Sequence, residues 1–459
     1  MEQSVINRTI MVAAGRFAPG HLGELTQQVP FEMVEAVLAE TGRVQTRIRD
    51  LPARVVIYLL LAGCLFAELG YGQVWHRLTA GLDGLQVPTP TASALTQARR
   101  RVGPKPLQAL FDLLRGPAPS TATDGVRFGG LLVCAIDGTT MTVPDTAANL
   151  GVWTKHAGNH GGSGYPLLRM VALVACGTRT LIDVVFGPTS SGETTDAYQL
   201  LRSLRAGMLV LADRNFDAGA LIGAIGATDA HVLVRVKANR KLPVLRRYHD
   251  GSYLSMLGGA QVRVIECEIH ITTRAGRHTG VYRLATTLLD ACRYPAVGLV
   301  GLYHDRWEVE TAYLELKSSI LGGRVLRART PAGITQEVYA LLVCYQVLRL
   351  AMADATNTRA GLDPDRASFT IALNTARDQL IQATGVITAT TIDLVGTIGR
   401  HVLDNLLPDR RVRVSPRIVK RAISKYNARG PTINRTSYKA TVRIDILTPP
   451  AQLTTRAGP

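Results

Sequence analysis

Two short, continuously apolar runs constrain the fold of this chain more than any other feature. They occupy residues 131–136 (LLVCAI) and 208–212 (MLVLA). Runs without alternating polar residues are typical of strands that are covered on both faces. Between them, residues 167–175 and 180–186 flank a short Gly-Thr-Arg segment, which predicts an antiparallel hairpin. Helices are expected at 195–206 and 218–227, and a strand at 231–236. These elements predict an α/β fold with a mixed sheet.

The segment before these strands is helical in pattern. Residues 30–116 contain an amphipathic stretch that begins at Phe31 and an apolar helix over about 52–69. A shorter helix ends in Arg99, Arg100 and Arg101. Three arginines at a helix end fit a DNA-recognition helix. They fit a solvated helix end favoured by the helix dipole equally well, so both interpretations stay open.

The segment after these strands changes pattern twice. Residues 241–295 hold short alternating runs separated by glycine-rich turns, as in β-strands. Helical pattern returns at Tyr303 and continues past Leu350. We therefore predict a helical N-terminal region at 1–118, an α/β core at 126–240 that resumes at 297–350, a β-rich insertion at 241–296 and a helical, basic C-terminal region at 351–459.

Charge and cysteine usage indicate a partner and a compartment. The chain of 459 residues carries a formal charge of +17, which favours a nucleic-acid partner over a basic enzyme without one. Its six cysteines are scattered and form no C-x-x-C pair, as expected of buried thiols in a reducing compartment. The longest apolar run, 55–67, is too short to span a bilayer. A cytoplasmic, nucleoid-associated protein is expected.

Three acidic residues are candidates for metal-dependent chemistry. Asp137 and Asp213 each follow one of the buried runs. Taken alone, either is more typical of a turn than of a ligand, because Asp-Gly is a common turn dipeptide. On a helical wheel, Glu310 lies within about 60° of Tyr303, Arg306 and Lys317. A carboxylate flanked by two cations and a phenol suits a metal ion and phosphate oxygens, whereas Glu308 and Glu315 fall on another side of the helix.

The spacing Y-x2-R-x3-E-x6-K over Tyr303, Arg306, Glu310 and Lys317 resembles the signature of the DDE transposases of the insertion-sequence-four family. The segment around Asp137 resembles the first acidic motif of that family. The segment LADRNF around Asp213 resembles the second, with Asn215 in place of the usual glycine. Asn tolerates a left-handed backbone better than most residues, so it still allows the conformation that glycine would give. The resemblance covers about residues 30–350.

The resemblance implies an RNase H-like catalytic core and a cut-and-paste DNA transposase. Such an enzyme binds terminal inverted repeats, hydrolyses DNA with two Mg²⁺ ions, and joins 3′-hydroxyl ends to target DNA by transesterification. Asp137, Asp213 and Glu310 would hold the metals, with Mn²⁺ as a substitute. DNA contacts are expected from a set of aromatic and basic residues: Tyr303, Arg306, Lys317, Arg99, Arg100, Arg101, Trp307 and Arg214. Pairing of two ends implies a homodimer in the synaptic complex.

Other signals are weaker, and two rival functions remain. His156 and His160 lie in a glycine-rich loop without cysteine partners, so a DNA-facing loop is favoured over a metal pair. Residues 187–194 resemble a phosphate loop but carry Glu193 where lysine is required. Trp153 and Trp307 could stack on a flipped base, although a buried tryptophan is commoner. The basic run at 410–429 favours DNA. The rivals are another RNase H-fold nuclease and a non-catalytic DNA-binding protein.

Overall fold

The computed structural model describes residues 10–82, 84–120, 123, 125–155, 164–274, 276–382, 395–408, 413–414 and 438–447. The chain divides into two units, which are described separately. The first unit comprises Met1–Arg127, Leu132–Ser203 and Trp307–Leu406, and the second comprises Phe128–Leu131, Leu204–Arg306 and Leu407–Pro459.

Helices form the N-terminal part of the first unit, as predicted for residues 30–116. Two short strands, β1 (Ile10–Met11) and β2 (Phe17–Ala18), and two 3-10 turns, η1 (Ala13–Gly15) and η2 (Leu25–Gln27), come first. Five helices follow: α1 (Phe31–Glu40), α2 (Ala53–Leu65), α3 (Tyr71–Thr79), α4 (Ala92–Val102) and α5 (Lys105–Leu114). Every residue of α2 except Arg54 is buried, which confirms that the longest apolar run forms a core helix.

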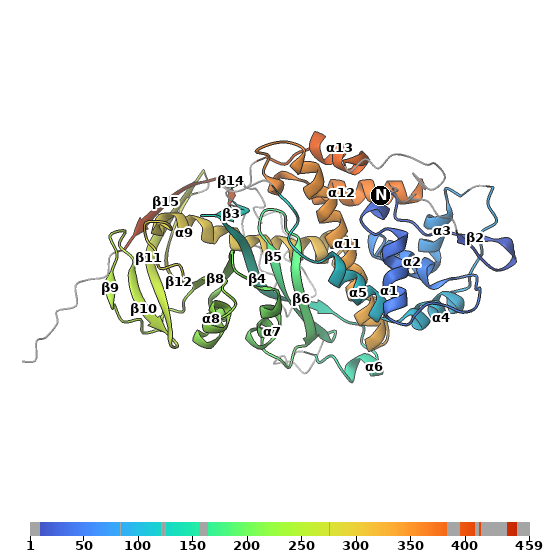
Figure 1. Cartoon of the computed structure of the whole chain (residues 1–459), viewed down its shortest axis with the longest axis horizontal. Helices are drawn as coiled ribbons and strands as arrows, with labels where there is room; N and C mark the ends of the chain where they lie inside the picture. The colour runs from blue at the N-terminus through green and yellow to red at the C-terminus, as the bar shows by residue number, and fades with distance from the viewer. Residues whose placement is uncertain are drawn as a thin grey trace, which may run out of the picture. The chain divides into compact units, whose positions relative to one another are not determined.

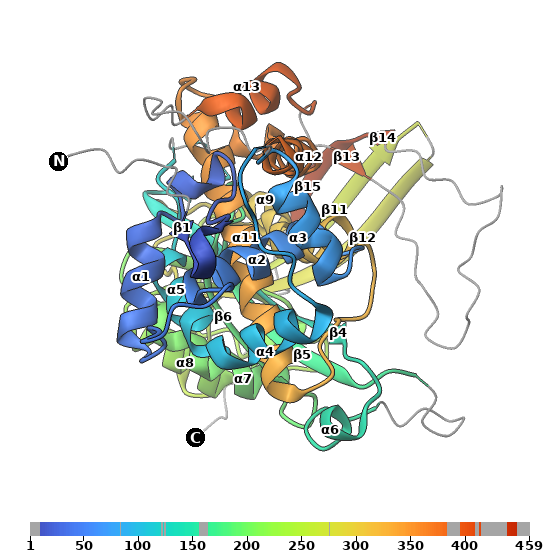
Figure 2. The same cartoon turned by 90° about the vertical axis from the view of Figure 1, so that its right-hand side faces the viewer.

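The long helix α11 (Pro331–Asn357) organises these helices. It begins with Thr330 as its N-cap and a proline in its first turn, as helix starts favour, and it packs against α2, α5, α12 (Phe369–Ile381) and α13 (Gly396–Asp404) (Figures 1 and 2). Its length and hydropathy would suffice to cross a membrane, but 78% of its most apolar window is buried inside the protein. That burial is typical of the core helix of a folded domain. The 3-10 turn η7 (Pro364–Arg366) precedes α12.

Three antiparallel strands of a larger sheet complete the first unit. They are β4 (Leu131–Thr142), β5 (Leu167–Ala175) and β6 (Leu181–Pro188), in the order β6-β5-β4. The predicted hairpin is confirmed, and Arg179 in its turn adopts a φ of 56°. The short helix α6 (Ala147–Leu150) follows β4. Helix α7 (Glu193–Leu200) and the 3-10 turn η3 (Leu201–Ser203) follow β6. Five cysteines are buried, Cys292 is exposed, and all six are free thiols.

The second unit combines a parallel strand pair with an antiparallel sheet. Strands β7 (Met208–Ala212) and β8 (His231–Arg235) are parallel and are joined through the 3-10 turn η4 (Arg214–Phe216) and helix α8 (Gly219–Gly226). Strand β8 pairs with β12 (Gly276–Thr286), which continues to β11 (Ala260–Thr273), β10 (Tyr253–Leu257) and β9 (Arg246–Arg247). At Gly219 a Cβ atom would lie 2.4 Å from Gly258 Cα, so α8 can pack this closely on the β10–β11 turn only with glycine at this position.

The remaining elements modify the predicted C-terminal half. The sequence predicted that the helical segment starts at Tyr303. It starts seven residues earlier, with helix α9 (Ala296–Leu302). Helices α11 to α13 confirm helical C-terminal structure, but β15 (Thr441–Ile446) adds a strand to β11 that the sequence did not predict. Short strands β3 (Arg127–Phe128), β13 (Arg413–Val414) and β14 (Tyr438–Lys439) are also present. The predicted α/β class with a mixed sheet is confirmed. Apart from Arg413 and Val414, the basic run at 410–429 lies outside the described residues, as do His156 and His160.

Candidate active site

Asp137 lies within a strand and not in a turn, which corrects the turn interpretation. Strand β4 continues six residues past the predicted end at Ile136, and Asp137 pairs with Ala172 of β5. The continuation is rich in threonine, whose branched side chain favours strands. The Asp137 carboxylate is half-buried, and its Oδ1 accepts a 2.8 Å hydrogen bond from the Gly138 backbone N–H.

A tyrosine hydroxyl connects the strand of Asp137 to the helix of Glu310. Tyr313 lies on α10 (Trp307–Leu314), donates a 2.6 Å hydrogen bond to the backbone oxygen of Asp137, and accepts one of 2.9 Å from the Ala172 N–H. The hydroxyl therefore bridges β4 and β5 at the Asp137–Ala172 pair. Burial raises the pKa of Tyr313 well above its ordinary value, and the charge of Asp137 adds to the rise. The phenol thus remains protonated and able to donate.

The helix that carries Glu310 does not keep one period, which corrects the predicted wheel. Tyr303–Arg306 form the 3-10 turn η5, α10 follows, and Glu315–Ile320 form the π-helical turn η6. A constant 100° step therefore does not describe the whole segment. Lys317, in the π-helical turn, still reaches β4, where its Nζ donates a 3.1 Å hydrogen bond to Thr139 Oγ1. Thr139 and Asp137 share one face of β4 because side chains alternate along a strand.

Glu308 and Glu315 belong to a buried ion network that does not include Glu310. Arg179 Nε lies 2.7 Å from Glu308 Oε2, and Arg179 Nη1 lies 3.3 Å from Glu315 Oε1. Arg179 also pairs with Asp365, and Arg349 pairs with Glu315. Of these five charged side chains only Glu308 is more than a tenth exposed. The network fixes α10 and η6 through side chains other than Glu310.

Asp213 lies in the second unit, directly after β7. Its side chain caps η4, and its Oδ1 accepts a 2.7 Å hydrogen bond from the Asn215 N–H. The turn interpretation is therefore correct for Asp213 as local structure. Asn215 is not among the residues with positive φ, so it does not use the left-handed backbone that asparagine allows. The 3-10 turn brings the Asn215 N–H to the carboxylate without it.

Two residues of the predicted signature lie beside Asp213. The Tyr303 hydroxyl donates a 3.1 Å hydrogen bond to the backbone oxygen of Ala212, the residue before Asp213. Burial raises the pKa of Tyr303 to about 12; the positive charge of Arg306 opposes the rise, and the charge of Asp213 adds to it. Tyr303, Arg306 and Asp213 are thus close enough to interact electrostatically. Lys317 instead bonds to Thr139 on the strand of Asp137. The four signature residues therefore do not all lie beside the same aspartate.

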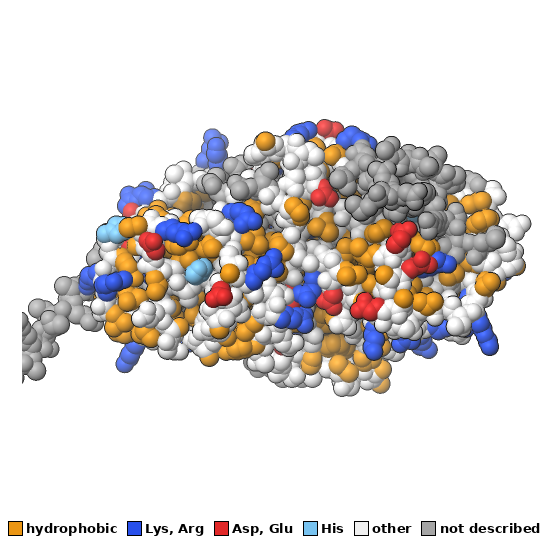
Figure 3. Space-filling model, viewed as in Figure 1, with side chains coloured by type: hydrophobic (Ala, Val, Ile, Leu, Met, Phe, Trp, Pro, Cys, Tyr) orange, Lys and Arg blue, Asp and Glu red, His pale blue; other side chains and the backbone are white. Residues whose placement is uncertain are grey.

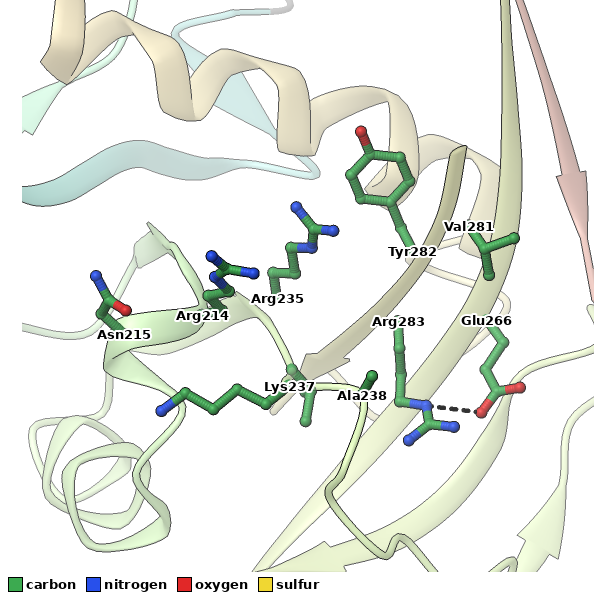
Figure 4. A pocket seen from close by; sticks show the side chains of 10 residues that line it. Arg214, Asn215, Arg235, Lys237, Ala238, Glu266, Val281, Tyr282 and Arg283 are labelled. Atoms are coloured by element: carbon green, nitrogen blue, oxygen red, sulfur yellow. Dashed lines mark hydrogen bonds and ion pairs between the residues drawn. The ribbon is translucent and has the colours of Figure 1, made fainter. Parts of the chain in front are cut away.

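A basic pocket of about 490 Å³ opens beside Asp213 in the second unit (Figure 4). Its cations are Arg214, Arg235, Lys237 and Arg283. The Arg235 guanidinium lies 4.5 Å from the centre of the Tyr282 ring, and Arg283 Nε lies 2.9 Å from Glu266 Oε1. Only Arg214 was predicted from the sequence. The run VRVKANRK at 234–241, a cluster of cations directly after a buried strand, was the signal available for the others.

A buried carboxylate fixes Lys237, which lines this pocket, and the nearby Arg240. Asp217, with a side chain only 1% exposed, accepts hydrogen bonds from Arg240 Nη2 at 3.0 Å and from the Lys237 N–H at 3.0 Å. The Lys237 ammonium lies 3.3 Å from the same carboxylate. Burial alone would raise the pKa of Asp217, but the hydrogen bonds from Arg240 and Lys237 hold it below its ordinary value. Lys237 and Arg240 are thus fixed side by side while their side chains stay 45% and 40% exposed.

The other predicted DNA-contacting residues differ in exposure. Arg99 packs its guanidinium 3.9 Å from the centre of the Tyr71 ring, whereas Arg100 is exposed and Arg101 is half-buried. Trp307 is 41% exposed and Trp153 only 4% exposed. The three arginines therefore have different surroundings, and Trp153 has the buried position that is common for tryptophan.

The three candidate acids form no metal-binding group in the part of the chain that the structure describes. Asp137, Asp213 and Glu310 are each half-buried, and their carboxylate oxygens are the hard donors that Mg²⁺ prefers. Among the residues that the structure describes, no three His, Cys, Asp or Glu side chains form a group that could hold a metal. Asp137 and Glu310 belong to the first unit and Asp213 to the second.

Comparison with known proteins identifies the family. Residues 19–112 match the family described as Insertion element 4 transposase N-terminal, and residues 129–347 match the Transposase DDE domain. The transposase InsG for insertion sequence element IS4 of Escherichia coli (strain K12) is 27% identical over 409 residues, which cover 86% of this chain and 91% of that protein. The chain belongs to the insertion-sequence-four family of DDE transposases. It is therefore a DNA transposase with an RNase H-like catalytic core, and its family uses divalent metal ions.

A solved structure gives a more distant likeness. The cryo-EM structure of a piggyBac transposase synaptic complex with hairpin DNA aligns with 84% of this transposase and 85% of that chain. The TM-score is 0.40 and the sequence identity is 10%. The DDE domain match, over residues that include Asp137, Asp213 and Glu310, is the finding that bears on chemistry.

Proposed function

We propose that this transposase excises its own element by Mg²⁺-dependent hydrolysis at the terminal inverted repeats and joins the 3′-hydroxyl ends to target DNA. Asp137, Asp213 and Glu310 are the proposed metal ligands. The observation that carries the proposal is the coverage of all three acids by the DDE domain match, together with half-buried carboxylates at each position. Two bound Mg²⁺ ions would supply an activated water or 3′-hydroxyl and stabilise the leaving oxygen.

The protein's own cations hold the DNA in this proposal. Lys317, fixed to Thr139 on the strand of Asp137, and Arg306, beside Tyr303 and Asp213, are positioned to bind non-bridging phosphate oxygens. In the second unit, the pocket cations Arg214, Arg235 and Lys237 bind phosphates as Arg306 does. Tyr303 and Trp307 place the terminal strand. Pairing of two ends requires two active sites, so the working assembly is a homodimer on nucleoid DNA in the cytoplasm.

The test is cleavage of a labelled DNA duplex that contains the sequences flanking the gene. Purified protein with Mg²⁺ is expected to release the labelled end. Removal of the metal with EDTA is expected to abolish cleavage, because carboxylates alone supply no activated nucleophile. Mn²⁺ added after EDTA is expected to restore cleavage. Cleavage that persists in excess EDTA would contradict the metal-dependent mechanism.

A second expected result concerns Tyr313. Replacing Tyr313 by phenylalanine keeps the ring but removes the hydroxyl that bridges Asp137 and Ala172. Loss of a residue that orients a metal ligand commonly costs about 10- to 100-fold in metal affinity or activity, so we expect a higher Mg²⁺ concentration for half-maximal cleavage. Tyr253→Phe, which removes a hydroxyl bonded to Glu266 in the second unit, is the matched control. An identical Mg²⁺ dependence in all three proteins would show that Tyr313 does not position Asp137.

A further inference from the structure

The loop between α1 and α2 is basic and exposed. Residues 41–52 contain Arg43, Arg47 and Arg49, all exposed. Two aliphatic side chains lie among them: Val44 is 63% exposed and Ile48 is 80% exposed. An isolated exposed apolar side chain needs no explanation, but two in a loop with three arginines form a surface with both positive charge and apolar contact area.

This loop lies against the C-terminal end of α4. Arg43 Nη1 donates a 3.1 Å hydrogen bond to the backbone oxygen of Arg101. Burial lowers the pKa of Arg101, and the nearby charge of Arg49 lowers it further. Both Arg43 and Arg49 of the loop therefore lie close to Arg101. We call the surface formed by Arg43, Arg47, Arg49, Arg100 and Arg101 the arginine surface. Lys and Arg side chains gather along the lower right edge of Figure 3, below the place of α4 in Figure 1.

The positive charge of this surface is not neutralised by the neighbouring acids. Asp50 pairs with Arg16 at 3.5 Å, and Glu35 pairs with Arg54. No ion pair joins Arg47 or Arg49 to an acid in the part of the chain that the structure describes. Holding like charges together raises the free energy of the protein unless an anion binds between them. The arrangement thus favours a polyanionic partner.

We propose that the arginine surface binds the backbone phosphates of a DNA duplex while Ile48 and Val44 contact the floor of a groove. Arginine forms bidentate hydrogen bonds with phosphate, and apolar side chains flanked by arginines enter the minor groove in several DNA-binding proteins. The proposal rests on DNA as the substrate of the proposed function. It assigns the contact to the loop and to Arg100 and Arg101, whereas Arg99 packs on Tyr71 and supports the fold.

The first test measures binding of the full chain to a labelled, mixed-sequence DNA duplex as a function of salt concentration. The double variant Arg47→Glu with Arg49→Glu is compared with Lys105→Glu with Arg205→Glu, which reverses two exposed cations outside the loop. Losing two phosphate contacts is expected to weaken binding at least about tenfold and to make the log–log salt slope about 1.8 less steep. An affinity and slope equal to those of the control pair would overturn the proposal.

The second test separates the apolar contact from the charges. Ile48→Ala is expected to weaken duplex binding about tenfold with an unchanged salt slope, because an apolar contact releases no counterions. All variants change exposed residues, so equal thermal unfolding midpoints serve as the folding control. Unchanged binding by Ile48→Ala, or tighter binding of the parent to vesicles of anionic phospholipid than to the duplex, would overturn the groove contact.

Measuring DNA cleavage beside DNA binding distinguishes a failure of the arginine surface from a failure of the proposed enzymatic function. If the parent protein cleaves DNA with Mg²⁺ and the Arg47/Arg49 variant binds as tightly as the control pair, the proposal for the arginine surface fails and the enzymatic function stands. If the parent binds the duplex through the arginine surface but does not cleave it with Mg²⁺, the proposed enzymatic function fails and the docking surface stands.

Discussion

Replacing Arg179 by methionine is expected to lower the free energy of unfolding by about 3–5 kcal/mol, the range found when one partner of a buried ion pair is removed. Arg179 is 2% exposed and faces Glu308, Glu315 and Asp365. Without it, Glu308 and Asp365 would lose their arginine partner in a medium that solvates charge poorly, and Glu315 would keep only Arg349. Urea unfolding of the purified protein measures the change.

Two further variants show whether buried charge causes this loss. Arg54→Met removes an exposed partner of Glu35 and is expected to cost only about 0–1 kcal/mol. Arg179→Lys keeps the positive charge but not the planar guanidinium. It should therefore lower the free energy of unfolding less than Arg179→Met does. Equal unfolding midpoints for Arg179→Met and Arg54→Met would show that the network does not hold α10 in place.

Amide substitution at each proposed metal ligand is expected to reduce cleavage by at least about 10²-fold, the loss typical of removing one group that stabilises charge in a transition state. The variants are Asp137→Asn, Asp213→Asn and Glu310→Gln. At the two aspartates the amide oxygen can still accept the hydrogen bonds from Gly138 and Asn215, so local structure is preserved while the negative charge is lost. Single-turnover cleavage of a labelled end measures the effect.

The control for these variants is an acid away from the proposed site. Asp145 is 38% exposed and pairs with Lys155 at 2.5 Å, so Asp145→Asn should cleave at the parent rate. If any one of the three acid variants also cleaves at that rate, the corresponding residue is not a metal ligand.

The sequence predicted the elements but not their exact limits at the site. Periodicity identified the N-terminal helices, the hairpin β5–β6 and the parallel strands β7 and β8, because burial of apolar side chains determines those patterns. It ended β4 at Ile136, since the half-exposed threonines after Asp137 lack an apolar signal. Pairing with β5 extends that strand, and such tertiary pairing is not visible in a local window.

The signature helix shows a second limit of sequence analysis. Residue spacing correctly separated Glu308 and Glu315 from Glu310, but a single helical period could not represent the 3-10 turn at Tyr303 or the π-helical turn at Glu315. These deviations accompany long-range contacts: Tyr303 bonds to Ala212, and Glu315 pairs with Arg349. The neighbours that change the helical period are distant in sequence.

The basic surfaces show a third limit. The arginine triplet was predicted as one group. In the structure, the Arg99 guanidinium instead packs on the ring of Tyr71, twenty-eight residues earlier in the chain. Likewise, the pocket beside Asp213 joins Arg235 and Lys237 to Tyr282 and Arg283 from the β-rich segment. Charge clusters can be counted in a sequence, but which cations face the same space depends on strand pairing between β8 and β12.

The most direct measurement of the central claim is calorimetric titration of Mn²⁺ into the complex of this transposase with a DNA end. The parent protein is expected to bind two Mn²⁺ ions per chain, and Asp137→Asn, Asp213→Asn and Glu310→Gln are each expected to lose at least one of them. Mn²⁺ binding with the parent's stoichiometry and affinity in all three variants would contradict the claim that these carboxylates form the metal site.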